Sequence, residues 1–195
     1  MEAVGGLGFA PADPADRNRG NAAMTDTTRY ARFASPIGDL LIEAKGDRLS
    51  GLHMLRGTSD PRLAAAGDDA RDAFMDGVRE QLEAYFCGRS RGFEVPLLQD
   101  GTPFQRKVWA ELSKVPYGET ISYAELARRV GSPGASRAVG GANGRNPIAI
   151  VVPCHRVIAA DGRLGGFGGG CDRKLWLLQH EAHVSGREAP ASWTA

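Results

Sequence analysis

The C-terminal half of the chain carries two strong helix-start signals, and they constrain the fold more than any other feature of the sequence. Thr102 and Gln105 form a capping box around Pro103, which suits the first position of a helix. Ser122 and Glu125 have the same spacing and predict a second capping box. The first signal opens an apolar stripe at helical spacing, made by Phe104, Val108, Leu112 and Val115. We therefore expect two helices whose first residues are defined.

A third helix is expected directly after these two. Gly131 should end the second helix, Ser132 should cap the next one, and Pro133 should occupy its first position. Two short helices joined by about three residues predict a helix-turn-helix. The later helix has little side-chain bulk, with small residues at Ala135, Ser136, Ala138, Gly140, Gly141 and Ala142. Such a helix suits close packing against a neighbour, or entry into a narrow groove of nucleic acid with Arg137 as its one long side chain.

The N-terminal half predicts a small antiparallel sheet and one helix. Three β-favouring runs between residues 30 and 55 are separated by turn formers near residues 35–38 and 46–47. The helix should stop at Gly88, and its apolar residues recur at Ala70, Phe74, Val78, Leu82 and Phe86. Residues 92–98 should add a last strand. The fold class is therefore α+β, a small sheet with a helix followed by a mostly helical part.

Composition divides the chain into four segments. Residues 1–27 are rich in Ala, Gly, Pro and Asp, which predicts a disordered leader in which Met24 could be the biological start. We place an N-terminal domain at 28–98, a C-terminal domain at 99–185 and a tail at 186–195. The 195 residues are 42% hydrophobic, with no apolar run of about 18 residues and no secretory signal. We therefore expect a cytoplasmic protein.

Charge and cysteine usage narrow the partners and cofactors. Residues 1–100 hold 12 basic and 16 acidic side chains, whereas residues 101–195 hold 12 and 7, so the C-terminal half suits a polyanion better. The three cysteines, Cys87, Cys154 and Cys171, are odd in number and have no repeating spacing, which favours reduced thiols. The four histidines add no familiar ligand spacing, so we expect neither a disulfide nor a metal site.

The stretch AIVVPCHRVIAADG places a cysteine and a histidine directly after an apolar run. Residues 148–152 should form a buried, strand-like segment that Pro153 ends, which leaves Cys154 and His155 at a turn. A free cysteine is usually an inert buried residue, and Cys87 and Cys171 are interpreted that way.

Cys154 differs because it has titratable and cationic neighbours. His155 and Arg156 could favour its thiolate, which is the reactive form of a cysteine. Adjacent side chains rarely hydrogen-bond each other directly, so His155 should act through a water molecule. Glu181 is the candidate carboxylate that orients the imidazole.

Taken together, these segments resemble the O6-alkylguanine-DNA alkyltransferase family. The likeness rests on PCHRVI preceded by SRAVGGANGRNP, on PYGETISY upstream and on DRKLWLLQHE downstream, in one order between residues 102 and 183. It implies a ribonuclease H-like N-terminal domain and a C-terminal winged helix-turn-helix. It also implies direct-reversal repair, in which an alkyl group on O6 of guanine, or on O4 of thymine, moves irreversibly to the protein after the nucleotide flips through the minor groove. The partner would be double-stranded DNA with alkylated bases, bound by a monomer that can cluster on DNA and needs no cofactor or protein partner.

The same resemblance assigns roles to individual residues. Cys154 would accept the alkyl group, His155 would deprotonate it with Glu181 as orienter, Asn146 would order the preceding segment, and Tyr123 would donate to the leaving guanine. DNA would contact Tyr123, Arg137, Ala138, Gly140, Gly141, Ala142 and Asn143, with Arg137 filling the space of the flipped base. The base pocket would be lined by Pro147, Val157, Gly165, Phe167, Gly168 and Gly169. Glycines after Phe167 depart from the family pattern, so backbone amides would replace side-chain contacts to O6.

Two other functions use part of the same pattern. A thiol hydrolase of the Cys-His type would employ Cys154 and His155 but would need an oxyanion hole, and it gives no use to the helix-turn-helix. A non-catalytic lesion-binding protein would keep the DNA-binding half without needing the cysteine. The presence of Cys154 favours alkyl transfer over simple binding.

Overall fold

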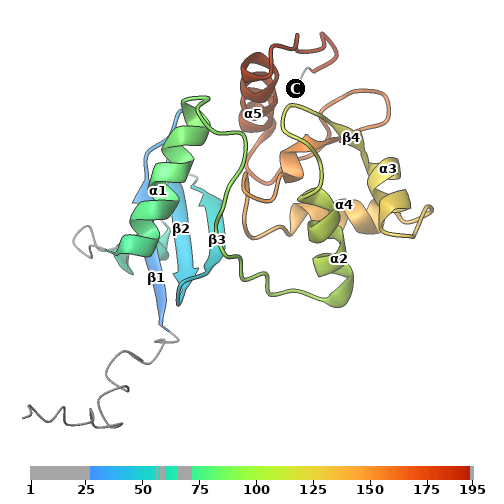
Figure 1. Ribbon diagram of the computed structural model, residues 1–195. Helices are drawn as coiled ribbons and strands as arrows, with labels where there is room; N and C mark the ends of the chain where they lie inside the picture. The colour runs from blue at the N-terminus through green and yellow to red at the C-terminus, as the bar shows by residue number, and fades with distance from the viewer. Residues whose placement is uncertain (1–26, 56, 58–59, 66–71, 194–195) are drawn as a thin grey trace, which may run out of the picture.

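The computed structural model describes residues 27–55, 57, 60–65 and 72–193. A small sheet with one helix lies beside a mostly helical C-terminal part (Figure 1). This arrangement confirms the α+β class expected from the sequence. The predicted leader lies outside the described residues except for Thr27, and so does Met24. None of the helices in the described ranges is long and apolar enough to cross a membrane.

The sheet is the predicted antiparallel meander. It contains β1 (Thr28–Phe33), β2 (Leu40–Lys45) and β3 (Leu49–Met54) in the order β1-β2-β3. Ala31 pairs with Ile42 and Ile42 pairs with Leu52. All three side chains are buried, as expected for residues on one face of a pleated sheet.

One α-helix covers a face of this sheet. A short 3₁₀ helix, η2 (Pro61–Ala65), precedes α1 (Ala73–Phe86). Asp72 caps α1 by accepting from the backbone N–H groups of Phe74 and Met75. Gly88 follows the helix with φ 69°, a conformation that glycine adopts without strain. The predicted helix and its stop are thus confirmed, while Ala70 lies outside the described residues.

Residues 92–98 do not form the predicted last strand. They make an isolated parallel bridge, in which Leu49 N–H donates to the carbonyl of Pro96 and Leu98 N–H donates to that of Leu49. Pro96 has no N–H to extend a ladder, so the segment touches β3 and then continues to the helical part.

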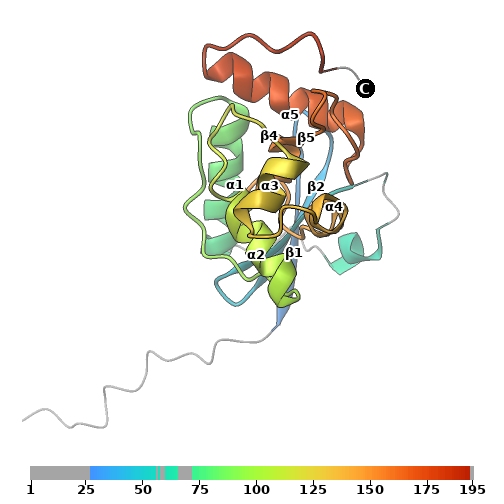
Figure 2. The same ribbon diagram turned by 90° about the vertical axis from the view of Figure 1, so that its right-hand side faces the viewer.

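The C-terminal part consists of several short helices and strands and one longer helix, α5. They are α2 (Pro103–Leu112), β4 (Ile121–Ser122), α3 (Tyr123–Arg129), α4 (Ser136–Gly144), η3 (Cys154–Arg156), β5 (Val157–Ile158) and α5 (Cys171–Val184). Strands β4 and β5 pair in parallel through Ile121 and Val157. Figures 1 and 2 show α5 at one end of the molecule, above the helix pair α3 and α4.

The predicted helix starts are correct to different degrees. The box of Thr102 and Gln105 has both of its hydrogen bonds and is confirmed. Ser122 accepts from the N–H of Glu125, which is the first hydrogen bond of the second box. The Glu125 carboxylate pairs with Arg128 and Arg129 and does not accept from the Ser122 N–H, so this box is only half formed.

Helix α4 starts later than predicted, at Ser136 with Ala135 as its N-cap. Ala135 N–H donates to the carbonyl of Ser132 at 2.9 Å, which closes a β-turn with Pro133 at its second position. Proline favours that turn position as well as a helix start, and here the turn forms. Ser132 and Pro133 therefore belong to the turn of the helix-turn-helix.

Strand β3 connects the two parts of the molecule. Leu52 N–H donates to the carbonyl of Pro147 at 2.9 Å, and Ala149 N–H donates to that of Leu52 at 3.1 Å. The segment that leads to Cys154 is therefore fixed against the N-terminal sheet.

Candidate active site

The residues before Pro153 form a tight turn and not the predicted strand-like segment. Val152 N–H donates to the carbonyl of Ile148 at 3.0 Å, and Ile150 has φ 71°, which is rare for a β-branched residue. The side chain of Asn146 holds this turn: its Nδ2 donates to the carbonyl of Val152 at 2.7 Å and its Oδ1 accepts from Ile148 N–H at 3.1 Å. These hydrogen bonds use backbone N–H and carbonyl groups of Ile148 and Val152 that would otherwise pair with a neighbouring strand.

Cys154 begins the short helix η3 directly after this turn. The residue is 5% exposed. Asn143 of α4 donates from Nδ2 to the backbone carbonyl of Cys154 at 3.3 Å. The turn on one side and α4 on the other therefore fix the position of the cysteine.

A buried hydrogen-bond network surrounds Glu181 of α5. The Oε1 atom accepts from His155 Nε2 at 2.9 Å, from Arg156 Nη2 at 2.9 Å and from the Tyr85 hydroxyl at 2.8 Å. The Oε2 atom accepts from Arg156 Nε at 2.9 Å and from Gly118 N–H at 3.1 Å. Glu181 and His155 are both 0% exposed. The predicted pairing of these two residues is thus present in the structure.

Burial and charge determine the protonation of this pair. Burial alone would raise the pKa of Glu181, but His155 and the Arg156 guanidinium hold it well below its usual range. Burial lowers the pKa of His155 despite the Glu181 carboxylate. His155 is therefore neutral near pH 7, with its proton on Nε2 facing Glu181 and a free electron pair on Nδ1. Among the described residues, Nδ1 of His155 is buried without a hydrogen-bond partner.

The cation near the thiol is not the one that the sequence suggested. Burial raises the pKa of the Cys154 thiol, while the Asn146 amide, the Lys174 ammonium and backbone N–H groups act against this rise. Arg156 instead donates its hydrogen bonds to Glu181 and to the carbonyl of Val115.

Lys174 is completely buried in α5. Its Nζ donates to the carbonyls of Val157, at 2.6 Å, and Leu164. Burial lowers the pKa of Lys174 to about 8.

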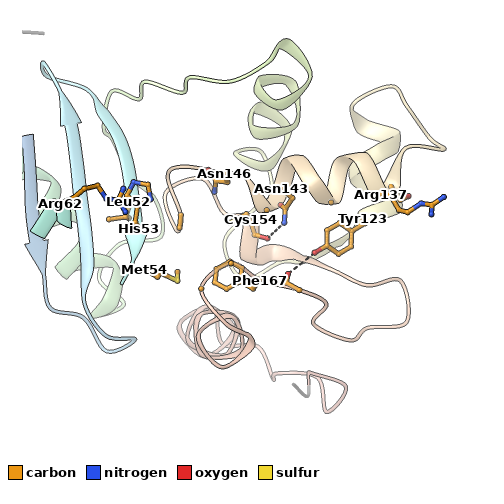
Figure 3. Close-up of a pocket in the computed structure, with 17 residues that line it drawn as sticks. Leu52, His53, Met54, Arg62, Tyr123, Arg137, Asn143, Asn146, Cys154 and Phe167 are labelled. Atoms are coloured by element: carbon orange, nitrogen blue, oxygen red, sulfur yellow. Dashed lines mark hydrogen bonds between the residues drawn. The ribbon is translucent and has the colours of Figure 1, made fainter. Parts of the chain in front are cut away.

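Cys154 faces a cavity of about 820 Å³, which is the size of sites that hold drug-sized ligands. Its wall includes Tyr123, Asn143, Asn146 and Ala149, and the loop residues Gly166, Phe167, Gly168 and Gly169. Figure 3 shows Cys154 between Asn143 and Phe167, with Leu52, His53 and Arg62 across the cavity. The cavity therefore lies between Cys154, the glycine-rich loop and the N-terminal sheet.

Three of the predicted pocket residues do not line this cavity. Val157 is completely buried because β5 pairs with β4. The carbonyl of Pro147 bonds β3, and Gly165 packs beside Tyr123, where an added Cβ would lie 3.4 Å from the ring. The cavity is also lined by residues that the sequence analysis did not place in the pocket: Leu52, His53, Met54, Arg62, Ser136, Gly144 and Ala149.

Tyr123 packs between Gly140 of α4 and the glycine-rich loop. A Cβ on Gly140 would lie 3.7 Å from the Tyr123 ring, and the Tyr123 hydroxyl donates to the carbonyl of Gly166 at 3.5 Å. Burial raises the pKa of Tyr123, so its hydroxyl stays protonated. Tyr123 thus connects α4 to the glycine-rich loop.

Fewer residues of α4 face outward than predicted. Ala138 and Gly141 are exposed, but Ala142 and Asn143 are 2% and 4% exposed and face inward. Ala142 accepts from Trp109 Nε1 at 2.9 Å, and Asn143 bonds Cys154. Helical spacing turns Ala142 and Asn143 toward α2 and the cysteine, and Asn143 also lines the cavity, so their contact with DNA stays a prediction.

Arg137 lies on the first turn of α4 and points away from Cys154 (Figure 3). The residue is exposed, and within the described ranges no hydrogen bond or ion pair engages its guanidinium. It is therefore available to a partner.

The two other cysteines differ in their surroundings. Cys87 is exposed, so its interpretation as a buried residue is wrong, and Cys171 is half-buried with its Sγ donating to the carbonyl of Gly165 at 3.6 Å. No group of three or more His, Cys, Asp or Glu side chains in the described part of the chain is arranged to hold a metal ion.

Comparison with known proteins assigns both halves of the chain. Residues 103–183 match the family model for the DNA-binding domain of 6-O-methylguanine DNA methyltransferase, and residues 28–99 match its ribonuclease-like domain. A methylated-DNA–protein-cysteine methyltransferase of Mycolicibacterium paratuberculosis is 50% identical over 165 residues, which are 85% of this chain and 96% of that protein. The corresponding protein of Methanosarcina acetivorans is 46% identical over 152 residues, or 78% and 97% of the two chains.

Solved structures agree with these matches. The crystal structure of Mycobacterium tuberculosis O6-methylguanine methyltransferase is 49% identical, covers 85% of this chain and 96% of its own, and has a TM-score of 0.74. Mycobacterium tuberculosis OGT in complex with DNA is 47% identical, covers 84% and 96%, and has a TM-score of 0.70.

Proposed function

Since this chain belongs to the methylated-DNA–protein-cysteine methyltransferase family of DNA-repair enzymes, we propose that Cys154 takes the alkyl group from O6 of guanine in duplex DNA. One observation carries this assignment: Cys154 faces a cavity of about 820 Å³ and is followed by a histidine that a buried carboxylate holds. A buried and inert thiol would need neither the cavity nor the network. O4 of thymine is a second acceptable position for the alkyl group, because the same thiol would reach it in the same cavity.

The proton of the thiol goes to His155 in this proposal. Nε2 of His155 is held by Glu181, so Nδ1 is the base, and a water molecule relays the proton from Cys154 to it. The sulfur then attacks the saturated carbon, the bond between that carbon and O6 breaks, and its electron pair stays on the guanine. Tyr123 supplies a proton or hydrogen bond to the base as it leaves. Asn146 keeps the turn before Cys154 in place while this happens.

The product is a thioether on the protein. Neither a histidine nor water hydrolyses a thioether as they would a thioester, so Cys154 is not regenerated. Each molecule is therefore used once, and the reaction needs no cofactor. The sequence-based expectation of a cytoplasmic monomer that needs no protein partner and can cluster on DNA stays a prediction.

Access to the guanine requires the nucleotide to leave the base stack. A purine O6 inside a duplex is out of reach of a buried thiol, and extruding the nucleotide costs a few kcal/mol. The exposed face of α4, with Ala138 and Gly141, is narrow enough for the minor groove, and Arg137 is the long side chain that would fill the vacated space. The cavity beside Phe167, Gly168 and Gly169 would receive the base.

Replacing Cys154 with serine tests the acceptor. We expect the variant to take no label from a duplex that carries O6-[³H-methyl]guanine, because an alcohol at this position is a far weaker nucleophile than a thiol. The matched variant C171S removes the half-buried thiol near the glycine-rich loop and should accept a full equivalent of label. Transfer to C154S, or its loss in C171S alone, would contradict the assignment.

Gly169→Ala tests which adducts the cavity accepts. An added Cβ would clash with Met54 Sδ and would lie 2.9 Å from Phe167 Cε1, so both side chains must shift. We expect transfer from O6-benzylguanine in DNA to slow by about tenfold or more and transfer from O6-methylguanine to change less, because the bulky group uses more of the cavity. Gly77→Ala is the control, since a Cβ there meets nothing within 4 Å and Gly77 lies on α1, outside the cavity lining. Equal slowing of both substrates would show that the bulky group does not reach Met54 and Phe167.

A further inference from the structure

The N-terminal part of the chain supplies one of the hydrogen bonds to Glu181. Tyr85 lies near the end of α1, is completely buried, and donates from its hydroxyl to Glu181 Oε1 at 2.8 Å. The other donors to this carboxylate come from the C-terminal part: His155, Arg156 and Gly118. The carboxylate is therefore held from both parts of the molecule.

Tyr85 and His155 share one oxygen atom. Both donate to Oε1 of Glu181, together with Arg156 Nη2. An ionised carboxylate has about four lone-pair sites, and here five hydrogen bonds occupy them. The direction and strength of the hydrogen bond from His155 to Oε1 therefore depend on the hydrogen bond that Tyr85 donates to the same atom.

The Tyr85 ring has little freedom to move. Its centroid lies 5.3 Å from those of Phe86 and Phe93, 5.9 Å from that of Tyr117 and 5.6 Å from that of His180. The backbone carbonyl of Tyr85 also accepts from His180 Nε2 at 2.9 Å. The hydroxyl is thus presented to Glu181 in one place.

We propose that Tyr85 is a positioning residue for alkyl transfer, which fixes the Glu181 carboxylate so that His155 Nδ1 is held toward Cys154. This inference rests on the function proposed above. The ribonuclease-like half would then help to position the catalytic base, because the Tyr85 hydroxyl acts on His155 through the Glu181 carboxylate. A hydrogen bond to a charged group in a dry interior is strong, so its loss would be felt at His155.

The charges around Glu181 and His155 give the direction in which the pKa of His155 should shift. Glu181 interacts with Tyr85, Tyr117, His155 and Arg156, and Lys174 acts on His155 from α5. Without the Tyr85 hydroxyl, Oε1 of Glu181 would hold more negative charge toward His155 and would raise its pKa. His155 would then stay protonated, and unable to act as a base, up to a higher pH.

Tyr85→Phe keeps the ring and removes only the hydroxyl. We expect its rate constant for transfer from O6-methylguanine duplex to fall about tenfold at pH 7, and the acid limb of its pH profile to move to higher pH. The deficit should shrink as the pH is raised. Tyr117→Phe is the matched control, because its hydroxyl is buried beside the same ring without a hydrogen-bond partner among the described residues.

The reaction separates this inference from a folding defect and from failure of the proposed function. Each molecule transfers once, so misfolded protein lowers the total transferred, while a misplaced base lowers the rate constant. Rate constants are measured over a range of pH for the wild type, Y85F and Y117F, together with their affinities for undamaged duplex, which should be equal. If Y85F and Y117F agree within about twofold at every pH, Tyr85 has no positioning role. If the wild type itself transfers nothing to Cys154, the proposed function fails.

Discussion

Glu181→Gln is expected to lower the free energy of unfolding by about 3 to 5 kcal/mol and to slow alkyl transfer by at least about 100-fold. Glu181 is completely buried and only accepts hydrogen bonds, from four different residues. The glutamine side chain would replace one of the two carboxylate oxygens with an NH₂ group, which cannot accept the hydrogen bonds donated there. It would also leave the buried Arg156 guanidinium without a counter-charge. The imidazole of His155 loses the group that fixes its proton on Nε2.

Urea unfolding at pH 7 and single-turnover transfer measure the two effects. Glu119→Gln is the control, because it removes the same charge from an exposed ion pair with Arg187 and should change stability by less than about 1 kcal/mol. A loss of stability in E181Q no larger than that of E119Q would contradict the account of the buried network. Transfer at the wild-type rate in a folded E181Q would contradict the role of the carboxylate in orienting His155.

Arg137→Ala is expected to slow repair of duplex by about 10- to 100-fold and to leave the reaction with free O6-methylguanine base unchanged. Extrusion of the nucleotide costs a few kcal/mol, and each 1.4 kcal/mol of barrier corresponds to about tenfold in rate. Arg137 is exposed on the first turn of α4 and points away from Cys154, so it can act on the stack but not on the sulfur (Figure 3).

Arg145→Ala provides the matched control for this prediction. Arg145 follows the other end of α4, is also exposed, and bonds the carbonyl of Gly141 within the helix at 3.5 Å. Both variants lose one positive charge and so lose similar long-range attraction to DNA. Equal slowing of duplex repair in R137A and R145A would reduce Arg137 to a general phosphate contact. Slowing of the free-base reaction in R137A would exclude the stack-filling role.

Features set by neighbouring residues could be predicted from the sequence. The meander, the stop of α1 at Gly88 and the cap of α2 depend on hydrogen bonds and conformations within a few residues. The pairing of His155 with Glu181 joins distant residues, and it was found because nucleophile, base and carboxylate follow a known chemical logic.

Features set by long-range contacts could not be predicted in this way. The apolar run 148–152 has a composition typical of a strand, but Asn146 accepts from Ile148 N–H and donates to the carbonyl of Val152, which holds the run in a turn. Leu52 of β3 bonds the carbonyl of Pro147 and the N–H of Ala149, at the start of the run. The start of α4 was also not predicted, although it depends on nearby residues, because Pro133 suits both the second position of a β-turn and the first position of a helix, and here the turn forms. Tyr85 has the pattern of an ordinary buried helix residue, and nothing near it in the sequence indicates the carboxylate that it bonds.

The central claim is that Cys154 is an alkyl acceptor that is used once. The most direct test is the intact mass of the full-length protein after incubation with excess duplex that contains O6-methylguanine, followed by peptide mapping. We predict a gain of one methylene group per molecule, located on Cys154, with no further gain at longer times or higher excess. Repeated turnover of the DNA without a gain in mass, or a methyl group located on Cys87 or Cys171, would contradict the account.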